Sequence, residues 1–325
     1  MKNKNIGIDL GTTTILIYEK NQGIVLCEPS VVAVDKLTQK VIAVGEKAYN
    51  MLGRTPNNII AIKPLKDGVI ADFDKTEVML DYLIRKIKGK SLFSRPKILI
   101  CCPSNITQVE KNAIREVAER TGAKKVFVEE EPKVAAVGAG MDIALAKGNM
   151  IVDIGGGTTD IAVLSLNGIV CSESLKIAGN TFDSDIMKYI KSKYKLLIGD
   201  ITAENIKKQI GTVLDKVKEK TLSVKGRDLY TGLPKIIEVK SSEVSDALKE
   251  SINLIIHSIK SVLEKVGPEI SSDIIDRGIM LTGGGALLNG LDNYIGKELN
   301  IPVKLAKNPL TSVAEGTGIM LETII

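Results

Sequence analysis

A short pattern occurs twice in this chain, about 145 residues apart, and it constrains the fold more than any other feature. Residues 8–14 read IDLGTTT, and residues 152–160 read VDIGGGTTD. In each copy an apolar strand ends in an aspartate, a turn of glycine and threonine follows, and another apolar strand begins. A repeat at this long spacing predicts two halves built on one plan rather than a solenoid of short units.

The length of the chain agrees with two lobes, because 325 residues are about twice a typical single domain. Ile, Val, Leu and Ala supply most of the apolar content, which suits buried strands and packed helices, so we expect an α/β fold. Expected strands cover residues 6–9, 15–18, 24–27, 98–101, 125–128, 150–154, 159–166 and 278–282. Expected helices cover residues 107–120, 203–220 and 243–266.

Composition excludes one class of function. The chain has no Trp, 4 Phe and 7 Tyr, so the stacking surfaces that single-stranded nucleic acids need are scarce. The net charge of +5 is too modest to indicate a nucleic-acid partner. The N-terminal residues lack the pattern of a signal peptide, and no apolar run approaches the roughly 20 residues that span a bilayer, so we expect a cytoplasmic protein.

The repeated turn has the chemistry of a phosphate site. Glycine lets the backbone approach a ligand closely, exposed N–H groups bind anions, and threonine hydroxyls donate to phosphate oxygens. An aspartate at the strand end supplies the hard oxygen that Mg²⁺ prefers, usually through water. One such turn is commonly only structural, but two copies predict loops that grip one polyphosphate from opposite sides. The chain contains neither a G-x-x-x-x-G-K-[ST] motif nor a G-x-G-x-x-G that follows a strand and opens a helix.

Residues 9–13 and 153–160 therefore resemble the phosphate loops of the actin, heat-shock 70 and sugar-kinase ATPase superfamily. Within it, five further blocks spread along the whole chain look like the MreB family of bacterial actins: residues 28–33, 64–72, 130–136, 138–140 and 226–234. The resemblance implies an actin-like (ribonuclease H-like), duplicated two-lobe ATPase fold with a nucleotide cleft between the lobes.

The same resemblance implies the division of the chain. Lobe I would comprise residues 1–143 and 312–325, with a small insert at about 32–67. Lobe II would comprise residues 144–311, with a small insert at about 178–241.

The resemblance also implies a site for ATP or ADP with Mg²⁺. Asp9 and Asp153 would hold the metal, largely through water. Glu131 would position the attacking water, helped by Thr158. The residues expected to bind the nucleotide are Gly11, Thr12, Thr13, Thr14, Gly155, Gly156, Gly157, Thr158, Gly179, Glu204, Asn205, Ile206, Lys207, Gly283, Gly284, Gly285, Ala286 and Leu287.

Plainer interpretations of these residues stay open. Glu204 and Lys207, one helical turn apart, are also the pattern of an exposed ion pair. Glu131 and the two glutamates before it are also the pattern of a solvated strand end. The chain departs from the family pattern at Thr14 and Asp160, and at Lys133, a cation close enough in sequence to pair with Glu131 and slow turnover.

A basic stretch resembles the family's membrane-inserting loop. Residues 83–97 contain six Lys or Arg and no acid, with Leu92 and Phe93 at the centre. Apolar residues ringed by cations suit an anionic leaflet, at about 1 kcal/mol per basic residue near the surface. The alternative is a helix end with both side chains in the core.

The resemblance implies a filament protein that organises bacterial cell shape, with ATP hydrolysis tuning filament dynamics. Its partners would be further copies of itself in paired filaments, an anionic membrane surface at the inner face of the cell membrane, and other cell-shape or cytoskeletal proteins. Two classes of the same superfold remain alternatives: a chaperone-type ATPase and a small-molecule kinase. The chaperone class appends a substrate domain, whereas this chain ends at Ile325, and the block at residues 226–234 disfavours both.

Overall fold

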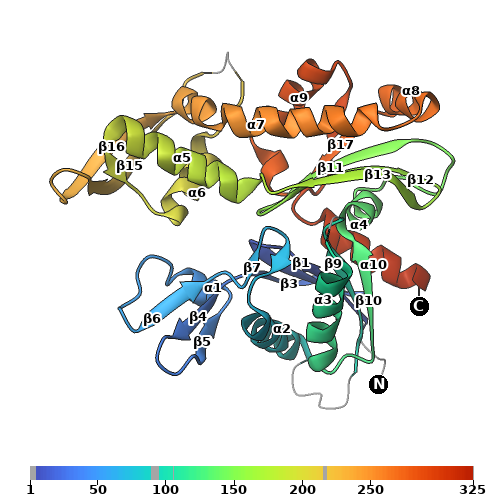
Figure 1. The fold of residues 1–325 in the computed structure, drawn as a ribbon, viewed down its shortest axis with the longest axis horizontal. Coiled ribbons are helices and arrows are strands. Elements are labelled where there is room, and N and C mark those ends of the chain that lie inside the picture. The colour runs from blue at the N-terminus through green and yellow to red at the C-terminus, as the bar shows by residue number, and fades with distance from the viewer. Residues whose placement is uncertain (1–4, 89–94, 105, 215–217, 325) are drawn as a thin grey trace.

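The computed structural model describes residues 5–88, 95–104, 106–214 and 218–324, which form two lobes of sheets and helices (Figure 1). The strands of the first half are β1 (Asn5–Leu10), β2 (Thr14–Glu19), β3 (Gly23–Pro29), β4 (Val32–Asp35), β5 (Val41–Val44), β6 (Ile59–Ile62), β7 (Leu65–Lys66), β8 (Val69–Ile70), β9 (Lys97–Cys102) and β10 (Lys125–Glu130). Those of the second half are β11 (Asn149–Ile154), β12 (Thr159–Ser165), β13 (Gly168–Leu175), β14 (Leu196–Leu197), β15 (Thr221–Asp228), β16 (Pro234–Lys240), β17 (Ile279–Thr282) and β18 (Val303–Leu305).

The helices pack against these sheets. They are α1 (Glu46–Tyr49), α2 (Phe73–Lys88), α3 (Gln108–Arg120), α4 (Glu131–Gly138), α5 (Gly179–Tyr194), α6 (Asp200–Ile210), α7 (Ser241–Glu264), α8 (Pro268–Arg277), the 3-10 turn η1 (Gly285–Leu287), α9 (Leu291–Leu299) and α10 (Ser312–Ile324).

The two large sheets have the same topology. Their strand orders are β10-β9-β1-β2-β3 and β18-β17-β11-β12-β13. In each, an antiparallel meander of three strands is extended by two parallel strands beside its first strand. The two copies of the repeated pattern are the β1–β2 and β11–β12 turns, which occupy equivalent places. The duplication expected from the sequence is therefore confirmed.

The two three-stranded sheets are β5-β4-β6 and β14-β15-β16. In Figure 1, β4, β5, β6 and α1 lie on the same side of the molecule as β15, β16, α5 and α6, while α4 and α10 lie on the other side. The first group falls within residues 32–67 and the second within residues 178–241. The exact lobe limits stay a prediction. Lobe I here means residues 1–143 and 312–325, lobe II means residues 144–311, and the small insert of lobe I means residues 32–67.

The expected helices at 107–120 and 243–266 are confirmed as α3 and α7. The helix expected over 203–220 is wrong beyond Ile210. Gly211 takes an extended conformation at the end of α6, with ψ 132°, and β15 begins at Thr221, directly after the expected helix. A continuing run of apolar and charged residues resembled a helix, but Thr212 instead forms a parallel β-bridge with Asn289, and a contact this distant in sequence overrides local helix propensity.

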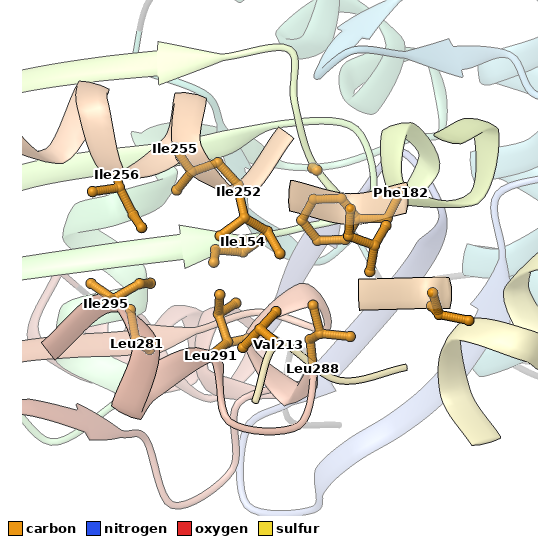
Figure 2. Close-up of a cluster of buried hydrophobic side chains, with 14 of the residues drawn as sticks. Ile154, Phe182, Val213, Ile252, Ile255, Ile256, Leu281, Leu288, Leu291 and Ile295 are labelled. Carbon is orange, nitrogen blue, oxygen red and sulfur yellow. The ribbon is translucent and has the colours of Figure 1, made fainter. Parts of the chain in front are cut away.

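The core of lobe II fixes the segments that carry its loops. Figure 2 shows apolar side chains from five elements directed toward one another, among them Ile154 of β11, Phe182 of α5, Ile252 of α7, Leu281 of β17 and Leu291 of α9. All five are buried. Ile154 immediately precedes the second glycine–threonine turn, so burial of this strand end holds the turn in place.

Another cluster of apolar side chains packs between the two large sheets. It contains Leu99 of β9, Val134 of α4, Ile151 of β11, Ala162 of β12 and Leu321 of α10, all buried. Helix α4 therefore rests on both large sheets, and its first residue, Glu131, lies where they meet.

Candidate functional site

The two glycine–threonine turns lie directly against each other. A Cβ atom added to Gly156 would lie 1.9 Å from Thr13 Oγ1 and 2.6 Å from Thr13 Cβ. One added to Gly157 would lie 2.6 Å from Thr12 Oγ1. Real Cβ atoms do not approach other atoms so closely, so only glycine permits this contact.

A third glycine turn follows β17 and lies beside the second. Gly283 has a φ of +85°, and its Cβ would lie 2.3 Å from Asp153 Oδ1. Strands β11 and β17 are parallel neighbours, with Asp153 paired to Thr282. Adjacent parallel strands end at the same edge of a sheet, so both turns reach one place.

A cavity of about 520 Å³ opens among these turns. Its volume is in the range of about 300–1,000 Å³ that is typical of small-molecule sites. Of the residues expected from the sequence, the cavity is lined by Asp9, Gly11, Thr12, Thr13, Thr14, Glu131, Asp153, Gly155, Gly156, Gly157, Thr158, Gly179, Glu204, Lys207, Gly283, Gly284, Gly285 and Leu287.

Three expected residues do not line the cavity. Asn205 is exposed on α6, whereas Ile206 and Ala286 are buried in the core of lobe II. Successive helical residues point in different directions, so the face of α6 that carries Glu204 and Lys207 cannot also present the two residues between them. We leave these three out of the proposed site.

Threonines of the first turn tie neighbouring segments together. Thr12 Oγ1 accepts a hydrogen bond from the N–H of Gly68 at 3.0 Å. Thr13 Oγ1 lies 3.4 Å from Asn180 Oδ1, at the start of α5. The N–H of Asn180 donates to the carbonyl of Gly156 at 2.8 Å, so this one side chain and its backbone connect both turns.

Lys207 is held at the cavity wall by α5. Its Nζ lies 2.8 Å from Asp183 Oδ1 and donates to the carbonyl of Gly179 at 2.8 Å. Glu204 pairs instead with Lys208, at 2.7 Å. The interpretation of Glu204 and Lys207 as an exposed ion pair with each other is therefore wrong.

Four carboxylates gather where the turns meet. Burial raises the pKa of Asp9 to about 7. Burial, together with the negative charges of nearby Asp160 and Asp9, also holds the pKa of Asp153 well above its ordinary value. Burial also raises the pKa of Asp160, and burial together with the charges of Asp160, Asp153 and Asp9 raises that of Glu131. Such a cluster gains stability when a cation or protons neutralise it.

Asp9 and Asp153 are the residues able to hold a hydrated divalent cation. The Oδ2 atom of Asp153 is buried and has no hydrogen-bond partner within the described ranges, so it is able to accept a hydrogen bond from a ligand or from metal-bound water. Over those same ranges, no three His, Cys, Asp or Glu side chains come close enough to ligate a metal directly.

The carboxylate cluster should make the ligand-free protein less stable as pH rises. The pKa of Asp9 is about 7 in the folded protein, above the ordinary value of 3.8, so between these pH values the folded state binds more protons. Between pH 5 and 7.5 without divalent cations, we expect the free energy of unfolding to fall by about 2–3 kcal/mol from Asp9 alone. Denaturant unfolding at both pH values measures this. Asp9→Asn should flatten the profile, and an unchanged slope in the variant would contradict the assignment.

Lys133 does not pair with Glu131, and the expectation that it slows turnover in this way is wrong. Its Nζ lies 3.4 Å from Glu129 Oε2. Residues i and i+2 point to different sides of a helix, so Lys133 in α4 is directed away from Glu131. Glu130 pairs with Lys111 at 3.1 Å, which leaves Glu131 as the glutamate of the three that lines the cavity.

Several cavity residues were not found from the sequence. Tyr49 and Lys63 come from the small insert of lobe I, and Asn180 and Asp183 from the start of α5. The pattern GNTFD at residues 179–183, which opens a helix with a glycine, was the available signal for the last two. Nothing in the local sequence of the insert indicates that it faces a cavity.

The expected membrane residues Leu92 and Phe93 lie outside the described residues. Two bases of the same stretch are paired: Arg85 with Asp81 at 2.8 Å and Lys86 with Glu28 at 2.5 Å. Two acids outside residues 83–97, Asp81 one helical turn away and Glu28 distant in sequence, thus neutralise part of the basic stretch. Among the helices that the structure describes, none combines the length and apolarity needed to cross a membrane.

Solved structures of other proteins share this architecture. The chain is similar to crystal structures of MreB5 of Spiroplasma citri, one bound to AMPPNP and one bound to ADP; the first aligns with a TM-score of 0.95 and 41% identity, covering 100% of this chain and 97% of that one. A MamK double helical filament aligns with a TM-score of 0.84 at 24% identity, covering 99% of both chains, and shows the fold alone. The fold is that of actin-like proteins.

Sequence comparison identifies the family. The chain is 61% identical to the cell shape-determining protein Mbl of Bacillus cereus over 321 residues, 99% of this chain and 96% of that protein. It is 48% identical to the cell shape-determining protein MreB of Escherichia coli (strain K12) over 329 residues, 100% of this chain and 95% of that protein. The MreB/Mbl protein family matches residues 3–325. The chain belongs to the MreB/Mbl family, and neither a chaperone-type nor a kinase interpretation is retained.

Proposed function

We propose that this protein binds ATP or ADP with Mg²⁺ in the cavity between its lobes, hydrolyses ATP slowly, and polymerises into filaments that organise bacterial cell shape. The observation that carries the proposal is the direct contact of the two glycine–threonine turns at one end of the cavity. The nucleotide-bound MreB5 structures of Spiroplasma citri and the cell-shape names of the Bacillus and Escherichia relatives support it.

Each part of a nucleotide would contact a different group of cavity residues. The polyphosphate would lie between the turns at residues 11–14 and 155–158, where backbone N–H groups and threonine hydroxyls donate. Glu204 and Lys207 would face the nucleoside, and the bare backbone of residues 283–285 would lie against the base. Asp9 and Asp153 would hold Mg²⁺ through water, and the cation would neutralise phosphate charge when bound.

Glu131 would orient the attacking water. It begins α4 at the cavity wall, beside Asp9, Asp153 and Asp160, and its side chain forms no ion pair with Lys133. Phosphoryl transfer depends on holding the nucleophile in line with the bond that breaks. A carboxylate at this position would accept a hydrogen bond from the water, and Thr158, which also lines the cavity, would help.

Assembly and membrane contact rest on family membership. Closure of the lobes around ATP would favour a polymer, and hydrolysis would loosen it. Residues 92 and 93 would contact an anionic leaflet at the inner face of the cell membrane, weakly in a single subunit and firmly in a multivalent filament. Other cell-shape proteins would be further partners.

Sedimentation with and without liposomes tests this proposal. With ATP and Mg²⁺ we expect the protein to pellet, and anionic liposomes should raise the pelleted fraction severalfold. Replacing Leu92 and Phe93 by serine should remove the effect of liposomes while filaments still form. A chain that stays monomeric at every salt and nucleotide condition would contradict the filament proposal, and unchanged liposome binding of the serine variant would place the membrane contact elsewhere.

A further inference from the structure

A tyrosine of the small insert of lobe I reaches across the cavity to lobe II. Tyr49 ends α1, and its hydroxyl donates to Glu204 Oε2 at 2.6 Å, 155 residues further along the chain. In the described part of the chain, one other hydrogen bond joins the small insert to residues 144–311, from Lys63 Nζ to Asn180 Oδ1 at 3.3 Å. The insert is thus fastened to lobe II at two separate points.

The two contacts lie at different parts of the cavity. Asn180 touches the first glycine–threonine turn through Thr13 and the second through Gly156. Glu204 lies on α6, at the wall proposed for the nucleoside. All four residues of the two contacts line the cavity. The Tyr49 contact therefore joins the small insert to the wall proposed for the nucleoside, whereas the Lys63 contact joins it to the residue that touches both turns.

The carboxylate of Glu204 is fixed from both sides. Its Oε1 atom pairs with Lys208 Nζ at 2.7 Å, and its Oε2 atom accepts the Tyr49 hydroxyl. Burial acts to raise the pKa of Glu204, but the hydrogen bonds from Lys208 and Tyr49 outweigh it and the pKa is lowered. Burial and the charge of Glu204 raise the pKa of Tyr49, so the phenol keeps its proton and remains a donor.

We infer that Tyr49 is a positioning residue of the nucleotide site: its hydroxyl holds Glu204 in place and fastens the small insert over the nucleoside, so that the nucleotide leaves only after this hydrogen bond opens. The inference rests on the proposed ATP site and adds to it a residue that controls release. A hydrogen bond to a charged group is strong enough to change a dissociation rate about tenfold. Its loss should act on the dissociation rate more than on the association rate.

Tyr49→Phe tests this, because it removes one hydroxyl and keeps the ring. A fluorescent ATP analogue bound to the protein with Mg²⁺ is chased with excess ATP in a stopped-flow instrument. We expect the variant to release the analogue about tenfold faster than the unsubstituted protein. Tyr194→Phe is the matched control, since the Tyr194 hydroxyl also donates to a glutamate, Glu243, at 2.6 Å, but both residues belong to lobe II. It should release the analogue at the unsubstituted rate.

Glu204→Ala separates positioning from a general effect on stability. If Tyr49 acts through Glu204, adding Tyr49→Phe to Glu204→Ala should cause no further acceleration, whereas a merely structural role would lower the melting temperature without this dependence. Release from Tyr49→Phe at the unsubstituted rate, or equal acceleration in both backgrounds, overturns the inference alone. Failure of the unsubstituted protein to bind ATP overturns the proposed site and this inference together.

Discussion

Replacing Gly156 by alanine is expected to weaken ATP binding about 100-fold. The new methyl group would lie 1.9 Å from Thr13 Oγ1 and 2.6 Å from Thr13 Cβ, so a change of the threonine rotamer cannot relieve the clash. The two turns must separate, and each then loses its geometry toward the phosphates. Overpacking of this kind costs about 1–3 kcal/mol, and about 2.7 kcal/mol corresponds to 100-fold in affinity. Calorimetric titration with ATP and Mg²⁺ measures the change.

Gly199→Ala is the matched control. A Cβ at Gly199 meets no atom within 4 Å, and its φ of −94° suits any residue. Affinity should therefore stay within twofold of the unsubstituted protein. Full-strength ATP binding by Gly156→Ala, with the melting temperature unchanged, would show that the two turns do not act together on the polyphosphate.

Glu131→Gln is expected to reduce the rate of phosphate release at least 100-fold while ATP affinity changes less than threefold. The amide keeps the size of the side chain but removes the carboxylate that orients water, and a positioned acid or base typically contributes about 100- to 10,000-fold. Phosphate release under saturating ATP measures turnover, and calorimetry measures binding.

Glu129→Gln is the control for this substitution. It makes the same chemical change two residues earlier, at a side chain that pairs with Lys133 rather than lining the cavity. Its turnover should match the unsubstituted protein. Equal turnover of Glu131→Gln and Glu129→Gln would remove Glu131 from the proposed mechanism.

Local patterns sufficed to predict the turns of the site. A strand that ends in Asp, followed by Gly and Thr, encodes its own geometry, because glycine and threonine act through nearby backbone. The second copy at residues 152–160 then predicted two equivalent sheets, and β1–β2 and β11–β12 have that relationship. Glu131 was found through the family block that contains it, although its position in the cavity depends on α4 resting on both sheets.

Contacts across the cavity could not be predicted in the same way. Tyr49 and Lys63 belong to an insert whose orientation is set by packing between distant segments, so their partners Glu204 and Asn180 have no local signature. The partner of Lys133 depends on where α4 begins, which the sequence does not specify to the residue. Asn205 and Ile206 have a different reason: they lie beside Glu204 in sequence, but the helical period of α6 turns them away from the cavity.

Titration of the unsubstituted protein with ATP, with and without Mg²⁺, tests the central claim most directly. We predict one ATP bound per chain, with tighter binding when Mg²⁺ is present because the cation neutralises the buried carboxylates Asp9 and Asp153 together with the phosphates. Absence of ATP binding in both conditions, or binding that Gly156→Ala and Gly199→Ala leave equally intact, would contradict a polyphosphate site between the two turns.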